Sequence, residues 1–340
     1  MFKKHRKKII AAVLVILLAA GVWLLWRDAY GTSSPSKVTL AVEKVLPLPA
    51  AVINGRHFVT LKDLRRNLAA TRQFYEGQDF ASIGVRIDFT TEEGKKKLKL
   101  WERTILDKLI EDKVVSLLAE EKGIKITDAQ ARARVNQELK RLGRGSVVRD
   151  NIKRLWGFDI EDFSRFVVKP QLYRERLAKI AAKEQDLTSL KQRILEAKSA
   201  LDQGMDFAVV ARQYSDAPDA ASEKAGAAKW FAAEELAEPV LEAVSAVPAG
   251  SYTDVIETEN GFNVVWVKEK KQEDGGELYL LKNIIVYKPT FADWLDEQIR
   301  RFSIKVPLAD YYWNEKTAHV AFAEGELRDF AEEVAENGIE

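Results

Sequence analysis

The longest apolar run of the chain lies near its N-terminus. Residues 9–26 carry no charge, and the segment 1–8 before them is rich in Lys and Arg. A run of this length can span the hydrocarbon core of a bilayer and is long for a signal peptide. We therefore expect a single transmembrane anchor over 9–26, with 1–8 in the cytoplasm and the bulk of the chain extracytoplasmic. A cleaved signal peptide is the alternative.

Helical periodicity dominates the next part of the chain. Residues 27–50 contain Ser and Pro and predict a linker, and from 51 to 186 apolar positions recur at helical spacing. Pro170 should kink the last of these helices. We predict an all-helical domain over 51–186. Its helices should begin at residues whose side chains cap a helix N-terminus, namely Thr60, Thr91, Thr127 and Asp159.

The pattern changes at Thr188. Short amphipathic helices are followed by two strands within 248–267, joined by a turn at Asn260–Gly261, and by a further strand over 277–287. Beyond residue 288 an apolar stripe at helical spacing predicts a C-terminal helical segment over 288–340. The predicted fold class is therefore α+β, with an N-terminal transmembrane helix.

Composition excludes several kinds of chemistry. The chain has no cysteine, and its only histidines are His5, His57 and His319. Disulfides and thiol catalysis are therefore excluded, and neither a His-based metal site nor a Ser-His-Asp triad is expected. The net charge of +1 argues against a nucleic-acid partner. We expect no cofactor and no bound metal.

Several motifs resemble the parvulin (PpiC-type) family of peptidyl-prolyl isomerases. They are "DFAVVARQYSD" (206–216), "WF" (230–231) and "VIETENGFNVV" (255–265), in the order and spacing of that family, and the match covers roughly 187 to 268. The upstream segment "VINGRHFVTLKDL" (52–64) is similar to the N-terminal chaperone region of SurA-type and PrsA-type foldases. The resemblance implies a parvulin-like antiparallel sheet wrapped by short helices over 187–287, and a rotamase and chaperone role in protein folding.

The chain departs from the parvulin pattern at its centre. The histidine of the family's last strand falls on Asn263, and its acidic or thiol residue falls on Ala217. The glycine-rich stretch before "WF" is changed over 225–229. The resemblance places peptide binding at Leu236 and Val240, which stand for the Met and Phe of the proline pocket, and at Trp230, Phe231, Ser215 and Asp216.

The strand that opens the family's domain is missing before Thr188. Its motif resembles "NIIV" (283–286), which places Asn283 at a second histidine position. A hairpin from 261–269 into 277–287 would pair residues whose numbers sum to about 546, so Asn263 would face Asn283. We hypothesise that 277–287 supplies the missing strand in a circularly rearranged module. The alternative is an extra edge strand.

Two interpretations of Asn263 follow from the sequence. It is either a buried polar cross-link or a contact for a bound prolyl peptide. Isomerisation about an X–Pro bond breaks no covalent bond, so an apolar cup and a few oriented hydrogen bonds can suffice. Leu236 and Val240 make a shallower cup, and Ala217 removes a polar group. We therefore expect an isomerase activity that is weak or lost.

The expected function is that of a membrane-anchored foldase. Its partners would be unfolded or nascent exported polypeptides with X-Pro bonds, bound in the manner of a chaperone. The alternative is a non-enzymatic scaffold or partner protein of the cell envelope.

Overall fold

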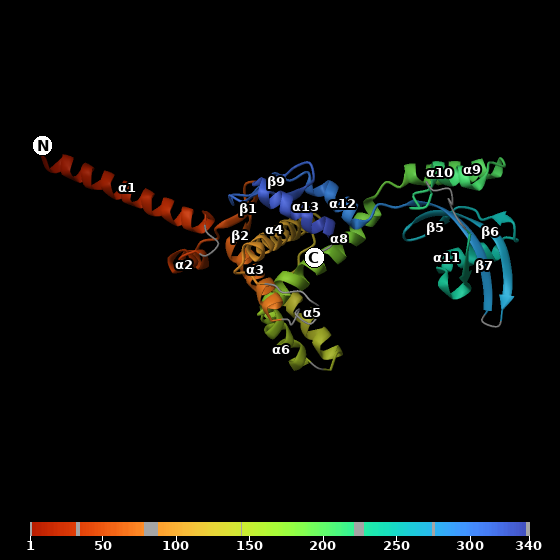
Figure 1. Cartoon of the computed structure of the whole chain (residues 1–340), viewed down its shortest axis with the longest axis horizontal. Helices are drawn as coiled ribbons and strands as arrows, with labels where there is room; N and C mark the ends of the chain where they lie inside the picture. The colour runs from red at the N-terminus through yellow and green to blue at the C-terminus, as the bar shows by residue number, and fades with distance from the viewer. Residues whose placement is uncertain are drawn as a thin grey trace. The chain divides into compact units, whose positions relative to one another are not determined.

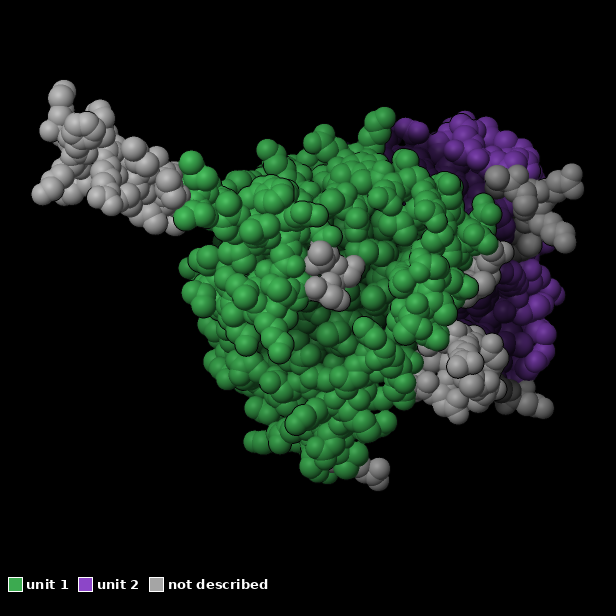
Figure 2. All heavy atoms as spheres, turned by 60° about the vertical axis from the view of Figure 1, so that its left-hand side comes forward, with its two compact units in different colours: residues 1–180, 295–340 green, residues 181–294 purple. Residues whose placement is uncertain are grey.

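The chain folds into two compact units in the computed structural model (Figure 1 and Figure 2). Unit 1 comprises residues 1–180 and 295–340, and unit 2 comprises residues 181–294. The structure describes residues 2–31, 35–77, 88–143, 145–220, 228–273 and 276–337. Side chains of the basic segment 1–8 and residues 225–227 of the changed glycine-rich stretch lie outside the described part.

Four helices of unit 1 begin at the predicted caps. The side chains of Thr60, Thr91, Thr127 and Asp159 each accept a hydrogen bond from the backbone N–H three residues later. At Thr127 the Gln130 side chain completes a capping box. Between residues 37 and 184 the α-helices are α2 (Lys37–Val45), α3 (Leu61–Glu76), α4 (Glu92–Glu121), α5 (Asp128–Arg141), α6 (Gly145–Trp156), α7 (Ile160–Phe163) and α8 (Lys169–Glu184).

The distortion predicted at Pro170 takes the form of a π-helix. Residues Ser164–Val168 form this element, η2, between α7 and α8. The N–H of Lys169 donates to the carbonyl of Ser164, five residues earlier. Because Pro170 has no N–H to continue the usual ladder, a wider turn directly before it is a low-cost solution.

The prediction of an all-helical domain over 51–186 is wrong. Strands β1 (Pro49–Ile53) and β2 (His57–Thr60) form an antiparallel hairpin at the start of this segment. Its turn places Asn54 and Gly55 at φ of 49° and 69°. An Asn-Gly pair in the left-handed region is a strong hairpin signal, and it outweighs the helical pattern around it.

The C-terminal segment also differs from the predicted helices. It begins with α12 (Phe291–Ile299) and ends with α13 (Gly325–Asn337), but strands lie between them. Strand β8 (Ile304–Lys305) pairs with β1, and β9 (Tyr311–Asn314) pairs with β10 (His319–Phe322). Val320 and Phe322 are buried on alternate positions of β10, so a two-residue period was hidden in an apparently helical stretch.

The predicted transmembrane anchor is contradicted. In the part of the chain that the structure describes, no helix combines the length and apolar character needed to cross a membrane. Residues 9–26 belong to α1 (Phe2–Gly31), whose last turn packs into unit 1. Ala29 is buried, the Tyr30 hydroxyl donates to the Pro49 carbonyl at 3.0 Å, and the Thr39 hydroxyl donates to Asp28 at 2.5 Å.

Unit 2 is a five-stranded sheet covered by short helices on both faces (Figure 1). Helices α9 and α10 pack on one face, where they share a buried cluster with β6 and β7, and α11 packs on the other. The elements are α9 (Thr188–Asp202), α10 (Phe207–Tyr214), β3 (Lys229–Ala232), η3 (Ala233–Glu235), α11 (Glu238–Ala246), β4 (Ser251–Tyr252), β5 (Ile256–Glu257), β6 (Gly261–Glu273) and β7 (Gly276–Tyr287).

Strand β7 is central in this sheet. The strand order is β3-β7-β6-β4. Strand β5 also pairs with β6, on the same edge as β4 but nearer to the start of β6. The alternative of an extra edge strand is therefore wrong. The register pairs Asn263 with Ile285 and Val265 with Asn283, so the two asparagines are diagonal neighbours and do not face each other directly.

Candidate functional site

The two asparagines lie on the same face of the sheet. Side chains alternate along β6, and Phe262 and Val264 join the core beneath α9 and α10. Asn263 and Val265 therefore point to the face that α11 covers. Asn283 is the cross-strand partner of Val265, and paired residues of neighbouring strands point to the same face of a sheet. Asn283 therefore points to this face as well.

A hydrogen-bond network fixes the orientation of Asn263. This side chain is buried, and its Nδ2 donates to the Thr258 hydroxyl at 3.2 Å and to the Gly261 carbonyl at 3.3 Å. Its Oδ1 accepts a hydrogen bond from Nδ2 of Asn283 at 2.9 Å. Every polar atom of this buried amide is thus satisfied, which removes the cost of burying it.

Asn283 is the open end of the network. It is exposed, and one of its two N–H groups is used by Asn263. Its second N–H and its Oδ1 make no hydrogen bond within the described residues. Asn283 therefore presents one donor and one acceptor to solvent, the pair of groups that a peptide backbone can meet.

Ser215 and Asp216 hold a loop against β7. The Ser215 hydroxyl accepts from the N–H of Ile285 at 3.1 Å, and the N–H of Asp216 donates to the Ile285 carbonyl at 2.7 Å. The Asp216 carboxylate accepts from the N–H of Tyr287 at 2.9 Å and pairs with Arg193. Both side chains therefore have structural partners, and their predicted contact with peptide stays a prediction.

The other predicted site residues divide between the two faces. Leu236, Val240 and Phe231 pack against the buried cluster on the α11 face, around Tyr279 and Leu281. Ala217 comes directly after Ser215 and Asp216, which are hydrogen-bonded to Ile285. Ile285 is in turn the cross-strand partner of Asn263. Trp230 pairs with Leu280 and so points to the opposite face, where Lys271 lies 4.3 Å from its ring centroid. The structure does not bring Trp230 to the asparagines.

Thr258 belongs to this site but was missed from the sequence. It receives a hydrogen bond from Asn263, and its own N–H donates to the Gly261 carbonyl. The signal was present, because a hydroxyl two residues before an Asn-Gly turn is well placed to bond within the turn.

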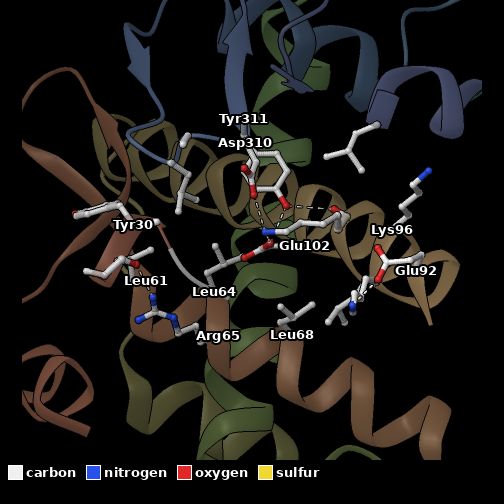
Figure 3. A pocket seen from close by; sticks show the side chains of 18 residues that line it. Tyr30, Leu61, Leu64, Arg65, Leu68, Glu92, Lys96, Glu102, Asp310 and Tyr311 are labelled. Atoms are coloured by element: carbon white, nitrogen blue, oxygen red, sulfur yellow. Dashed lines mark hydrogen bonds and ion pairs between the residues drawn. The ribbon is translucent and has the colours of Figure 1, made fainter. Parts of the chain in front are cut away.

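A second candidate site is a cavity of about 500 Å³ within unit 1 (Figure 3). Four separate parts of the sequence build it. Much of its wall is apolar, and Leu61 and Leu64 of α3 are almost completely buried. The lining comes from the end of α1 (Ala29, Tyr30, Gly31), α3 (Leu61, Leu64, Arg65, Leu68), α4 (Glu92, Lys95, Lys96, Leu98, Lys99, Glu102) and the C-terminal segment (Leu308, Ala309, Asp310, Tyr311, Leu327).

One wall of this cavity is a network of charged groups (Figure 3). Nζ of Lys99 lies 2.9 Å from Glu102 and 2.7 Å from Asp310, and the Tyr311 hydroxyl donates to Glu102 at 2.7 Å. Burial raises the pKa of Tyr311 far above its usual range, and the Glu102 carboxylate adds to this rise. Burial alone would lower the pKa of Lys99, but the two carboxylates outweigh it and the pKa is raised.

The charged groups around the cavity are already paired. Lys95 pairs with Glu92 at 2.6 Å and Lys96 pairs with Glu326 at 2.7 Å, while Arg65 pairs with Glu43. Among the described residues that line it, the cavity therefore has no unpaired cation or anion to recognise a charged ligand. It offers apolar surface, which suits the apolar side chains of a polypeptide.

Comparison with known proteins assigns a domain type to each part of the chain. Residues 174–269 match the PPIC-type PPIase domain, and residues 1–145 match the SurA-like N-terminal domain. The chain thus combines these two domain types, and the resemblance seen in the motifs is confirmed for both.

The individual relatives are named either as SurA chaperones or as PrsA foldases. The chain is 29% identical to the Chaperone SurA of Methylobacillus flagellatus over 44% of its own length and 35% of the relative. It is 24% identical to Foldase protein PrsA 3 of Bacillus cereus, over 44% of this chain and 56% of the relative. With Foldase protein PrsA of Geobacillus kaustophilus the identity is 26%, over 50% and 63%. The chain spans less than two thirds of each of these relatives.

Proposed function

We propose that this protein is a foldase-type chaperone that binds unfolded exported polypeptides. The observation that carries this proposal is the cavity of about 500 Å³ in unit 1, much of whose wall is apolar and whose charged groups pair with carboxylates or cations of the same unit. An unfolded chain exposes apolar side chains, and burying them in such a cavity is favourable whatever the rest of the sequence. The SurA-like match over residues 1–145 supports this use of unit 1.

In this proposal the PPIC-type domain binds prolyl peptides but isomerises them slowly. The barrier to rotation is roughly 20 kcal/mol, and a catalyst lowers it only through contacts that are stronger to the twisted amide than to the planar forms. Asn283 supplies a neutral donor and acceptor, and Ala217 supplies no polar side chain. A neutral side-chain amide bonds the peptide backbone equally well in its planar and its twisted forms. The site therefore binds the peptide but accelerates its isomerisation little.

Strand β7 takes the place of the missing first strand in this proposal. The PPIC-type match ends at residue 269, and β7 begins at Gly276. The hydrogen bond between Asn283 and Asn263 supports the circular rearrangement, because it joins the two positions at which the resemblance expects histidines.

We also place the chain outside the cytoplasm. Its N-terminus begins with a basic segment followed by an apolar run, which is the pattern that the export machinery recognises. Protease added to intact and to permeabilised cells tests this location. If protease digests a C-terminally tagged chain only after the cytoplasmic membrane has been opened, the proposed location is contradicted.

The chaperone function is tested by aggregation suppression with the full chain. Leu68→Arg introduces a charge at the cavity wall, and Ala69→Arg is the matched control at the next, exposed position of α3. We expect Leu68→Arg to weaken suppression by roughly tenfold, because a charge is costly in an apolar cavity. Equal behaviour of the two variants, or no suppression by the native chain, would favour a non-enzymatic scaffold.

The isomerase function is tested separately by protease-coupled isomerisation of an X-Pro tetrapeptide. We expect a rate close to the uncatalysed one, together with measurable binding of the same peptide. Turnover equal to that of an active PPIC-type enzyme would contradict the proposed loss.

A further inference from the structure

An apolar groove also lies in unit 1, and it shares no lining residue with the cavity of Figure 3. It has a volume of about 330 Å³ and is formed by α5, α6, η2 and α8. Its apolar lining includes the exposed side chains of Leu142 and Val167. The apolar lining residues are Val135, Leu139, Leu142, Val148, Ile152, Phe163, Val167, Val168 and Leu172.

The helices around the groove leave its apolar face uncovered. Helix α6 has twelve residues and no fully buried side chain, although Val148 and Ile152 line the groove. The π-helix η2 places two consecutive residues, Val167 and Val168, in the lining. Pro170 accounts for this π-helix, and π-helices are frequent at functional sites.

A basic hollow adjoins the groove. Leu139 lines both the groove and a neighbouring cavity of about 590 Å³, whose lining also includes Lys140 and Arg149. Arg149 contacts only the amide oxygen of Asn136, at 3.4 Å, and neither cation has a carboxylate partner within the described residues.

The carboxylates of the groove do not neutralise these two cations. Glu138 pairs with Arg134 and Arg141, while Glu175, on the α8 side of the groove, accepts from the Gln171 amide and has no cationic partner among the described residues. The groove thus presents apolar surface that leads to two uncompensated positive charges. This differs from the cavity of Figure 3, whose cations are all paired.

We propose that this groove binds segments of unfolded polypeptide in which an apolar run is flanked by Asp or Glu. The apolar side chains fill the groove, and the acidic side chain meets Lys140 and Arg149 in the hollow. Complementary charge of this kind selects among partners more than it adds affinity. The inference rests on the proposed chaperone function and assigns that function a preferred kind of sequence.

The experiment measures binding of two fluorescent peptides to the full chain by anisotropy. Both contain the run Leu-Phe-Val-Leu, which is preceded by Asp-Asp in one peptide and by Asn-Asn in the other. We expect the Asp peptide to bind roughly tenfold more tightly at low salt, and the difference to shrink at high salt because exposed charges are screened. Equal affinities would overturn the proposal.

Two double variants locate the interaction. Lys140→Glu with Arg149→Glu should remove the preference for the Asp peptide and leave the Asn peptide unchanged. Lys153→Glu with Arg154→Glu, exposed positions of α6 that line neither cavity, makes the same change of charge and should preserve the preference. Equal effects of the two double variants would overturn the assignment to the hollow.

A groove variant separates this inference from the proposed function. Val167→Asp should weaken binding of both peptides, and unchanged binding would overturn the groove as the site. Aggregation suppression that persists without an acidic preference would refute the inference and leave the chaperone function standing. A dimer of the native chain that Val167→Asp abolishes would mean that a second copy fills the groove, which also overturns the proposal.

Discussion

The two candidate sites bury polar groups in opposite ways. In unit 2 the buried amide of Asn263 is satisfied by neutral partners, namely Thr258, Gly261 and Asn283. In unit 1 the cavity wall is built from the charged groups of Lys99, Glu102 and Asp310, with Tyr311 donating to Glu102. The first network contains no group that titrates, and the second contains four.

This difference has consequences for stability and for pH. A neutral network loses about 1–3 kcal/mol when one partner is removed, because a buried amide is left unsatisfied. A charged network loses more, because an ion is left without its counter-charge. Only the charged network can make stability depend on pH. Four substitutions test this comparison.

The largest expected effect is that of Glu102→Leu. Glu102 accepts from both Lys99 and Tyr311, and its side chain is only 16% exposed. Its removal leaves the Tyr311 hydroxyl with only the Lys99 carbonyl, at 3.4 Å, and leaves Lys99 with one carboxylate, so we expect a loss of about 3 kcal/mol. Urea denaturation measures the loss, and hydrogen exchange localises it to unit 1. The exposed Glu297→Leu is the control, and equal losses would contradict the charged network as a source of stability.

Asn263→Leu should have a smaller effect, confined to unit 2. It leaves the Thr258 hydroxyl and the Gly261 carbonyl without the Asn263 donor, so we expect a loss of about 2 kcal/mol. Because none of these groups titrates, the loss should be the same at pH 5 and pH 9. Hydrogen exchange of β6 and β7 at both values measures it. A loss that changed with pH would show that a charged group participates.

The contact between the asparagines was predictable from the sequence, but its register was not. The predicted hairpin ended its first strand at residue 269, whereas β6 continues through Glu273. An exposed two-stranded ribbon tolerates polar side chains on both faces, so composition does not mark its end. Paired residue numbers near the turn sum to 549 (Glu273 with Gly276), and a bulge between Val267 and Glu269 lowers the sum only to 548 (Asn263 with Ile285), against the predicted 546. The asparagines therefore meet diagonally.

The cavity of unit 1 was not predictable, because its parts are distant in sequence. Tyr311 lies in a stretch with helical composition, and its strand is defined by pairing with β10. Lys99 and Glu102 look like surface charges of α4 until the C-terminal segment brings Asp310 to them. Local patterns predict helices and their caps, but a site assembled from four segments needs the tertiary contacts.

Tyr311→Phe should change how stability depends on pH. The folded-state pKa of Tyr311 is raised, so above about pH 10 the unfolded chain releases this proton while the folded chain keeps it. Stability then falls by up to about 1.4 kcal/mol per pH unit for this group. The variant should lose about 1 kcal/mol at pH 7, where the hydrogen bond is missing, and fall less steeply above pH 10. Denaturation between pH 7 and 11 measures both. Parallel curves would contradict burial of the neutral phenol.

The smallest effect on stability is expected for Asn283→Ala. Asn283 is exposed, so water can replace it as the donor to Oδ1 of Asn263, and the buried amide is not left unsatisfied. The loss should therefore fall below the roughly 1–3 kcal/mol of an orphaned amide, to about 0.5 kcal/mol. Asn263 keeps its two donated hydrogen bonds and loses only the one that its Oδ1 accepts. If Asn283 contacts the peptide, prolyl-peptide binding should weaken by roughly tenfold although the fold is unchanged. Trp230→Ala, on the opposite face, is the matched control for binding. If the variant binds the peptide like the native chain, Asn283 is no peptide contact, and the asparagine pair is a structural cross-link only. The burial and complete hydrogen bonding of Asn263 agree with that interpretation.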